Sequence, residues 1–226
     1  MHQLFFRCLT LNGRMIKIVS LVMIAALIPI YGCGGRSRPA YQIDQYLLSY
    51  DSPPIETSGP VNESLKFSRF AAASAYSGTH MAFRLPDRRI DAFNYSRWAV
   101  NPADMTADLL LRDVRKNGLF LAAFSRHDAG DSRFLLQGAV ESFYLDAGAE
   151  KKAFISLTVT LKDLRRQSPT ERIVYQKTYA DSEALKAQSP EGFALAMSAA
   201  MKRISKTVMD DIYVRARQRV SEGRED

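Results

Sequence analysis

Alternating apolar and polar positions recur along residues 41–179 and predict a fold rich in β-strands. The clearest case is residues 153–164, where Ile155, Leu157 and Val159 alternate with serine and threonine. One face of this strand should meet the core, and the other should face water or a partner. Breaker residues such as Pro86 and Pro169 mark turns between neighbouring strands. The predicted strands span residues 41–50, 65–70, 81–85, 90–95, 119–124, 134–145, 153–164 and 172–179.

Two helices are predicted from a different pattern, the breakers and caps at their ends together with apolar residues three or four positions apart. The first spans residues 102–117, because Asn101 can cap it, Pro102 suits its first position and Gly118 suits the position after its end. The second starts at Pro190, and the charged segment 215–226 is expected to fray. Its core-facing stripe is predicted to hold Phe193, Met197, Met201, Ile204, Val208 and Ile212.

An apolar run occupies residues 18–31 and follows Arg14 and Lys17. A positively charged region before a short apolar region is typical of a secretory signal. The run is shorter than the ~20 apolar residues that a transmembrane helix needs. We therefore interpret residues 1–32 as a signal peptide, with Met15 as an alternative translation start.

The apolar run ends at Ile30-Tyr31-Gly32-Cys33, which resembles the bacterial lipobox. In that motif an aliphatic, a variable and a small residue precede a cysteine whose thiol receives a lipid. The expected modification is a covalent lipid on Cys33, with a diacylglycerol on sulfur and an N-acyl chain. An uncleaved signal anchor and a buried free thiol are the alternatives. The other cysteine, Cys8, lies in the leader, so a chain that begins at Cys33 can form no internal disulfide.

The charge balance changes when the leader is removed. The whole chain of 226 residues has 31 basic and 24 acidic residues and a formal net charge of +7. Arg7, Arg14 and Lys17 precede Cys33 and no acidic residue does, so the remainder has 28 basic and 24 acidic residues and a net charge of +4. This modest excess is spread along the chain without a Lys/Arg block, which disfavours nucleic acid as a partner.

Candidate catalytic and metal-binding residues are sparse. The histidines are His2, His80 and His127, and His2 belongs to the leader, so a metal site would need the other two to meet carboxylates by chance. His127 and Asp128 are adjacent, which does not make the geometry of a nucleophile relay. No segment resembles a phosphate-binding loop. We therefore expect neither enzyme activity nor a cofactor apart from the covalent lipid.

Short segments in a particular order carry a resemblance to a known family. They include Tyr76-Ser77-Gly78, Tyr95-Ser96-Arg97-Trp98, Leu136-Gln137-Gly138, Val159-Thr160-Leu161 and Pro190-Glu191-Gly192. Together with the lipobox, this ordered set resembles the ABC-type transport auxiliary lipoprotein family, the family of paraquat-inducible protein C.

The resemblance implies an α/β fold in which helices cover a mixed sheet of about five strands, as in the sandwich of anticodon-binding domains. It implies a lipidated N-terminus, tether and first strand at residues 33–60, an auxiliary domain at residues 61–214 and a charged tail at residues 215–226. The implied partners are an inner-membrane ABC permease and ATPase, a periplasmic bridging protein of the mammalian-cell-entry (MCE) type, and further copies of the same chain. Gly34 replaces the aspartate of an inner-membrane retention signal, so the periplasmic face of the outer membrane is the expected location.

Two functions are compatible with this resemblance. An adaptor would dock the transport complex onto the outer membrane, whereas a carrier would hold a lipid or small hydrophobic molecule in its own cavity. A lysis or envelope-assembly lipoprotein of another family is a third alternative. A carrier needs a closed apolar pocket, whereas an adaptor keeps a packed core and presents aromatic residues on its outside.

The partner surface is predicted between residues 76 and 98, where aromatic residues are interleaved with arginines. These residue types are favoured at the centres of interfaces. Alternation should bury Phe83 and Phe93 in the core. The candidate contact residues are Tyr76, Arg84, Arg88, Arg97 and Trp98.

Overall fold

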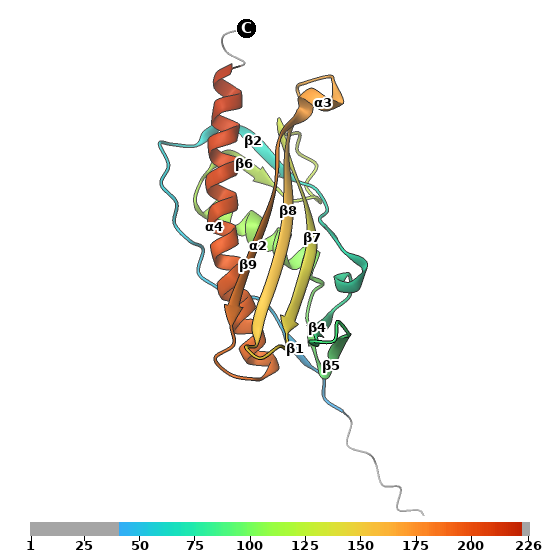
Figure 1. The fold of residues 1–226 in the computed structure, drawn as a ribbon. Helices are drawn as coiled ribbons and strands as arrows, with labels where there is room; N and C mark the ends of the chain where they lie inside the picture. Colours follow the sequence, from blue (N-terminus) through green and yellow to red (C-terminus); the bar gives the residue numbers. More distant parts are fainter. Residues whose placement is uncertain (1–40, 223–226) are drawn as a thin grey trace, which may run out of the picture. The chain divides into compact units, whose positions relative to one another are not determined.

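The computed structural model describes residues 41–222, so Cys33, the lipobox and the predicted signal lie outside the described residues. Residues 42–222 form one compact unit in which helices cover a mixed sheet (Figure 1). The strands are β1 (Asp44–Tyr46), β2 (Val61–Phe67), β3 (Ala71–Ala72), β4 (His80–Arg84), β5 (Ile90–Trp98), β6 (Phe120–Phe124), β7 (Phe134–Asp146), β8 (Lys152–Asp163) and β9 (Ile173–Ala184). The helices are the 3-10 turn η2 (Ser74–Tyr76), α2 (Pro102–Lys116), α3 (Pro169–Arg172) and α4 (Pro190–Glu222).

The long strand β7 organises the sheet. On one edge it pairs antiparallel with β8, which pairs antiparallel with β9. Along its other edge β2, β3 and β4 follow one another in parallel register, opposite residues 134–136, 139–140 and 145–146. β6 extends β2, while β5 and then β1 extend β4. Three strands therefore pair with the same edge of β7. Two of them begin separate extensions of the sheet, β2 with β6 and β4 with β5 and β1.

The predicted α/β class with a mixed, helix-covered sheet is confirmed. The sheet formed by the described residues has nine strands rather than about five. The additional strands are the short ones, because β1, β3 and β4 each pair over only two to five residues of a longer neighbour.

The prediction of a strand over residues 41–50 is right only for residues 44–46. The segment that follows β1 makes hydrogen bonds to helices instead of to a strand. The N–H of Ser49 donates to Ser198 Oγ (3.0 Å), and the hydroxyl of Tyr50 donates to Asp113 Oδ2 (3.0 Å). These contacts attach the segment between β1 and β2 to α2 and α4.

Helix α2 confirms the capping signals of the sequence. Asn101 Oδ1 accepts a hydrogen bond from the N–H of Asp104 (3.0 Å), and Pro102 occupies the first helical position. After the helix, Gly118 has a φ of 59°, a left-handed conformation that glycine adopts without a Cβ clash. These signals are local, which is why they could be read from the sequence alone.

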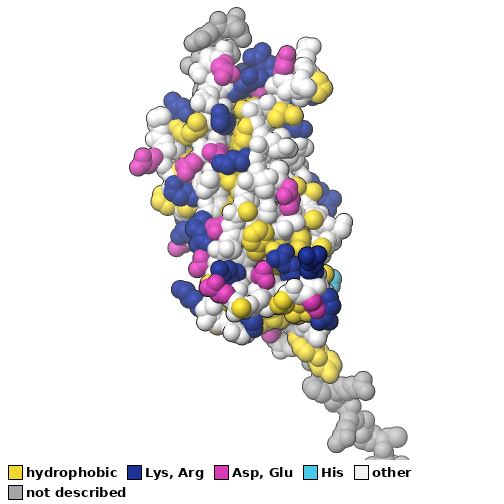
Figure 2. Space-filling model, viewed as in Figure 1, with side chains coloured by type: hydrophobic (Ala, Val, Ile, Leu, Met, Phe, Trp, Pro, Cys, Tyr) yellow, Lys and Arg dark blue, Asp and Glu magenta, His cyan; other side chains and the backbone are white. Residues whose placement is uncertain are grey.

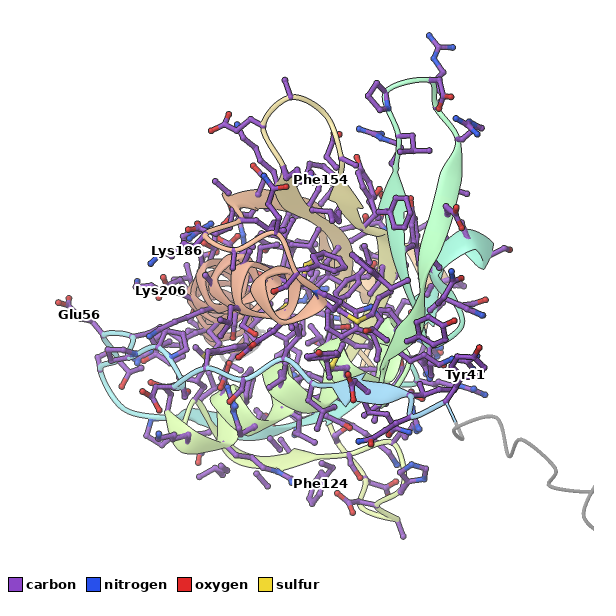
Figure 3. The ribbon with its side chains drawn as sticks, turned by 90° about the horizontal axis from the view of Figure 1, so that it is seen from below. Tyr41, Glu56, Phe124, Phe154, Lys186 and Lys206 are labelled. Carbon is purple, nitrogen blue, oxygen red and sulfur yellow. The ribbon has the colours of Figure 1, made fainter. Side chains whose placement is uncertain are left out.

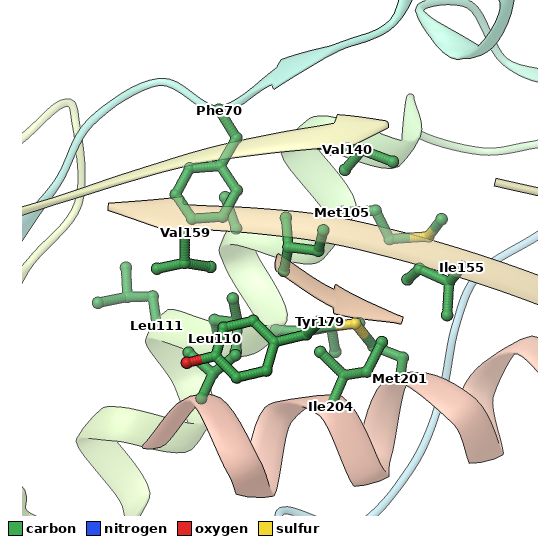
Figure 4. Close-up of a cluster of buried hydrophobic side chains, with 14 of the residues drawn as sticks. Phe70, Met105, Leu110, Leu111, Val140, Ile155, Val159, Tyr179, Met201 and Ile204 are labelled. Carbon is green, nitrogen blue, oxygen red and sulfur yellow. The ribbon is translucent and has the colours of Figure 1, made fainter. Parts of the chain in front are cut away.

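Helix α4 is about 50 Å long, at 1.5 Å per residue. Its six predicted core residues are at most 3% exposed, and Figure 4 shows Met201 and Ile204 facing the side of the sheet that carries Ile155. The prediction that the helix frays after residue 215 is wrong for residues 215–222. These residues are helical, Ala216 is fully buried, and Arg219 pairs with Asp163. No helix within residues 41–222 has both the length and the apolar composition that crossing a membrane requires.

Candidate partner-binding surface

Trp98 is not a surface residue, so its prediction as a contact residue is wrong. Its side chain is 1% exposed, and its ring packs edge-on against Phe143 and Phe193, with centroids 5.3 and 5.4 Å apart. The reason is an irregularity between β4 and β5, where residues 80–82 lie opposite residues 92–97. The alternation of β5 therefore changes phase between Phe93, which packs against the core, and Ser96, so Ser96 and Trp98 are buried while Tyr95 and Arg97 are exposed.

The other aromatic residues of β4 and β5 follow the prediction. Phe83 and Phe93 are partly buried against the core, with ring centroids 5.4 Å apart. Arg97 is exposed on β5 opposite His80, and Arg88 is exposed in the turn between β4 and β5. Neither arginine belongs to the cluster that forms around Arg84.

Tyr76 and Arg84 do come together, and residues from β7 and β8 join them. The guanidinium of Arg84 lies 4.4 Å from the centre of the Tyr144 ring and donates a hydrogen bond to Asp146 Oδ2 (2.9 Å). The ring of Tyr144 stacks on Tyr76 at 6.0 Å and lies 5.3 Å from Phe154. We call these five residues the aromatic–arginine cluster.

Strand register explains why the cluster forms. Arg84 lies opposite Asp146 in the parallel pair of β4 and β7, and Tyr144 lies opposite Phe154 in the antiparallel pair of β7 and β8. The 3-10 turn η2 ends at Tyr76 and carries it to the same place. Phe154 faces outward because its neighbours in β8 alternate toward the core.

The cluster is accessible and electrostatically ordinary. The side chains of Arg84 and Asp146 are 45% and 38% exposed, whereas Tyr144 is largely covered by its neighbours. Burial raises the pKa of Tyr76 and of Tyr144, and the Arg84 guanidinium partly offsets this rise. The hydrogen bond to Asp146 raises the pKa of Arg84. The phenols therefore stay neutral and the guanidinium stays charged at neutral pH, which suits contact with a partner rather than proton transfer.

The neighbouring face of the sheet carries few charges. Around the middle of β8 and β9 its outward side chains are uncharged and hydrogen-bonded to one another, as in Thr158 with Thr178 (2.7 Å) and Gln176 with Thr160 (2.8 Å). Figure 2 shows this mostly uncharged area, with hydrophobic and basic side chains gathered below it. The cluster thus borders a polar, charge-poor surface.

Sequence reasoning missed Tyr144, Asp146 and Phe154. The outward direction of Phe154 could have been predicted, because side chains alternate along a strand and Phe154 is adjacent to the core residue Ile155. No such signal exists for the parallel register of β4 against β7, which places Arg84 beside Asp146.

Two features of the described residues bear on metal binding and on ligand storage. Within residues 41–222 no three His, Cys, Asp or Glu side chains are grouped so that they could hold a metal ion. A hollow of about 300 Å³ between the end of β9 and the start of α4 is lined by Leu195 and other largely apolar residues, and it is open to solvent. The large aromatic side chains of the core are shielded from solvent, since Trp98, Phe134, Phe143 and Phe193 are all less than 2% exposed.

Comparison with known proteins assigns the family. The profile of a family described as ABC-type transport auxiliary lipoprotein component matches residues 46–209. No match is found among curated proteins. The crystal structure of protein XCC0632 from Xanthomonas campestris is similar, with a TM-score of 0.70 and 18% sequence identity over 78% of this chain and 98% of that chain. A crystal structure of an uncharacterized protein has a TM-score of 0.59 and 12% identity over 76% of this chain and 99% of that chain. These two similarities show a shared fold, and because the family profile spans more than half of the sequence, this chain belongs to the ABC-type transport auxiliary lipoprotein component family.

Proposed function

We propose that this protein is a non-enzymatic adaptor, anchored to the periplasmic face of the outer membrane by the lipid on Cys33. In this role it docks an MCE-type ABC transport complex that moves lipids or other hydrophobic substrates between the two membranes. Membership of the auxiliary lipoprotein family supports the general role in ABC-type transport. The ATP-driven step belongs to the permease and ATPase subunits, because no phosphate-binding loop occurs in this sequence.

The aromatic–arginine cluster is the observation that supports docking. Tyrosine and arginine are enriched among the residues that dominate binding energy at interfaces. Asp146 and the ring of Tyr144 already hold Arg84 in place, so little side-chain entropy remains to be lost when a partner binds. We propose the MCE-domain bridging protein as the partner, with a second copy of this chain as the alternative occupant.

The packing of the core favours an adaptor over a carrier. A carrier needs an enclosed apolar cavity of several hundred cubic ångströms. The apolar hollow beside Leu195 is open to solvent, and the central side chains of the core leave no exposed surface. The alternative function, a periplasmic carrier that binds a lipid in its own cavity, would require this core to open.

Replacing Arg84 by glutamate is expected to abolish co-purification of the bridging protein from detergent-solubilised envelopes. The new carboxylate would lie beside Asp146, so the cluster would lose the guanidinium that covers Tyr144 and would gain a second negative charge at the proposed contact. Tyr76→Ala should weaken co-purification as well, by removing one stacked ring without any change of charge. Lys202→Glu, on an exposed position of α4, is the matched control and should behave as wild type.

The same preparations separate the adaptor from the carrier. Mass spectrometry of lipids extracted from the purified protein should detect no stoichiometric lipid beyond the covalent one. If Arg84→Glu and Tyr76→Ala both fold with wild-type melting curves and retain the bridging protein, the cluster is not the docking surface. One non-covalent lipid per monomer would favour the carrier.

A further inference from the structure

The hairpin of β4 and β5 lies at the end of the domain where the chain enters. The first strand, β1, pairs in parallel with β5, and Asp44 lies opposite Ser96. Ile90, at the end of the hairpin turn, is six residues from Ser96 along β5. At about 3.3 Å per residue, the turn therefore lies within about 20 Å of the start of β1. Figure 3 shows this hairpin, coloured teal to green, extending away from helices α2 and α4.

The end of the sheet that carries α3 lies much farther from the start of β1 than the hairpin turn does. β4 pairs with β7 up to Asp146, whereas α3 follows the end of β8, where Asp163 lies opposite Phe134. Residues 134 and 146 are twelve positions apart on one strand. This separation corresponds to about 40 Å. The hairpin turn therefore lies near the start of β1, where the chain enters the domain, whereas α3 lies at the opposite end of strands β7 and β8.

The length of the tether limits how the domain can face a membrane. Asp44 follows Cys33 at a distance of eleven positions along the chain. A fully extended chain of this length spans at most about 40 Å. Residues 34–43 need not be fully extended when the hairpin turn faces the bilayer. They would have to be fully extended for α3 to reach the same bilayer.

Arg88 gives the turn a positive charge that can meet anionic lipid. Residues 84–91 contain Arg84, Arg88 and Arg89 together with Asp87 and Asp91. Arg84 pairs with Asp146 (2.9 Å) and Arg89 pairs with Asp87 (2.6 Å), so Arg88 is the arginine of the turn whose charge no ion pair among the described residues offsets. Arg88 has a φ of 70°, a conformation better suited to glycine or asparagine, so backbone preference does not explain an arginine there. The tether adds two arginines, and no acidic residue occurs between positions 33 and 43. Basic residues close to a membrane are attracted to anionic headgroups.

Exposed apolar side chains gather at the same end. Ile90 is 48% exposed at the base of the turn, and Pro86 is exposed within it. Tyr95 on β5 and Ile43 beside β1 are 53% and 42% exposed. Aliphatic and tyrosine side chains flanked by arginines are typical of segments that rest in the membrane interface.

We infer that the hairpin turn, residues 85–90, rests on the bilayer that holds the lipid anchor. Arg88 contacts the phosphates of anionic headgroups, and Pro86 and Ile90 enter the interface. This inference rests on the proposed anchorage at Cys33. The contact fixes the orientation of the domain: α3 points away from the membrane, and the aromatic–arginine cluster, whose Arg84 directly precedes the turn, is held close to the lipid surface.

Site-specific fluorescence in vesicles tests this contact. After processing, the only cysteine of the lipidated protein is Cys33, whose thiol carries the lipid, so Arg88→Cys provides a single reactive thiol for an environment-sensitive label. Gln167→Cys, exposed just before α3, is the matched control. Both proteins are reconstituted in phosphatidylethanolamine–phosphatidylglycerol vesicles that contain acyl-brominated lipid. The label at position 88 should be quenched at least twofold, and the label at position 167 should not be quenched. Since Arg88→Cys removes a positive charge, the substitution works against the expected result.

Co-sedimentation with the vesicles, measured first, separates the two proposals. If the protein sediments but the label at position 88 is quenched no more than that at position 167, the membrane contact is wrong and anchorage stands. If the protein carries no lipid and does not sediment, anchorage is wrong, and the inference about the hairpin is overturned with it. Quenching at position 88 that is lost in the Ile90→Asp background would support insertion of the turn itself.

Discussion

Replacing Asp163 by alanine is expected to lower the free energy of unfolding by about 3 kcal/mol, because it removes the bidentate partner of the buried Arg133 guanidinium and leaves Glu63 (3.1 Å) as its remaining carboxylate. The side chain of Asp163 is fully buried, and that of Arg133 is only 7% exposed. The two form a bidentate pair, with Nη2–Oδ2 and Nε–Oδ1 distances of 3.0 and 3.2 Å. Arg219 of α4 also approaches Asp163, so the pair links β7, β8 and the last turns of the long helix.

Two controls separate the buried pair from ordinary surface charge. Urea unfolding of the double variant Asp163→Leu with Arg133→Met should recover much of the loss, because apolar side chains replace the buried pair and Glu63 keeps Arg165 as its partner (2.8 Å). Asp210→Ala breaks an exposed pair with Lys206 on α4 and should change stability by no more than about 0.5 kcal/mol. If Asp163→Ala and Asp210→Ala lowered the free energy of unfolding equally, the buried pair would contribute no more stability than the exposed one.

The effect of Asp163→Ala should also depend on pH. Burial alone would raise the pKa of Asp163, but hydrogen bonds from Arg133 and from the N–H of Arg165 outweigh burial and hold the pKa below its usual value. A carboxyl group with a lowered pKa in the folded state stabilises the protein at pH values above its unfolded pKa of about 4, and this stability is lost as the pH falls. The difference between wild type and Asp163→Ala should therefore narrow below about pH 4.

Replacing Cys33 by serine is expected to abolish lipid attachment completely. The hydroxyl of serine does not replace the thiol that the modification requires, and no other cysteine follows the apolar run. The variant should accumulate as an unprocessed precursor or as protein released from the membrane fraction. Metabolic labelling with a radioactive fatty acid, followed by gel electrophoresis, measures this directly.

Cys8→Ser is the matched control for lipid attachment, since Cys8 lies in the predicted leader and should be dispensable. Fatty-acid label retained by Cys33→Ser would contradict the lipobox interpretation. Loss of label in both variants would point to a general defect in export.

Local signals allowed much of the fold to be predicted. The cap at Asn101, the glycine after α2 and the alternation along β8 act within a few residues, and each predicts its element correctly. The long helix was predicted from its apolar stripe, but its end was placed too early. Its last turns are held by Ala216 in the core and by the pairing of Arg219 with Asp163, a contact between residues far apart in the sequence.

The partner surface was only half predictable for a similar reason. Arg84 and Tyr76 were found from their residue types, but Asp146 and Tyr144 come from a strand about sixty residues later. Trp98 was misplaced because the irregularity in β5 interrupts alternation. Residue type indicates what a side chain can do, whereas strand register decides which side chains meet.

Photo-crosslinking in living cells shows whether the aromatic–arginine cluster docks the bridging protein of the transport system. Tyr76 is replaced by p-benzoylphenylalanine, and Lys202 on the exposed face of α4 is replaced in the control. After irradiation, mass spectrometry identifies the crosslinked product. The account predicts a crosslink from position 76 to the MCE-domain bridging protein and none from position 202. A position-76 variant that is lipidated and folded but crosslinks only to a second copy of itself, or to nothing, would contradict it.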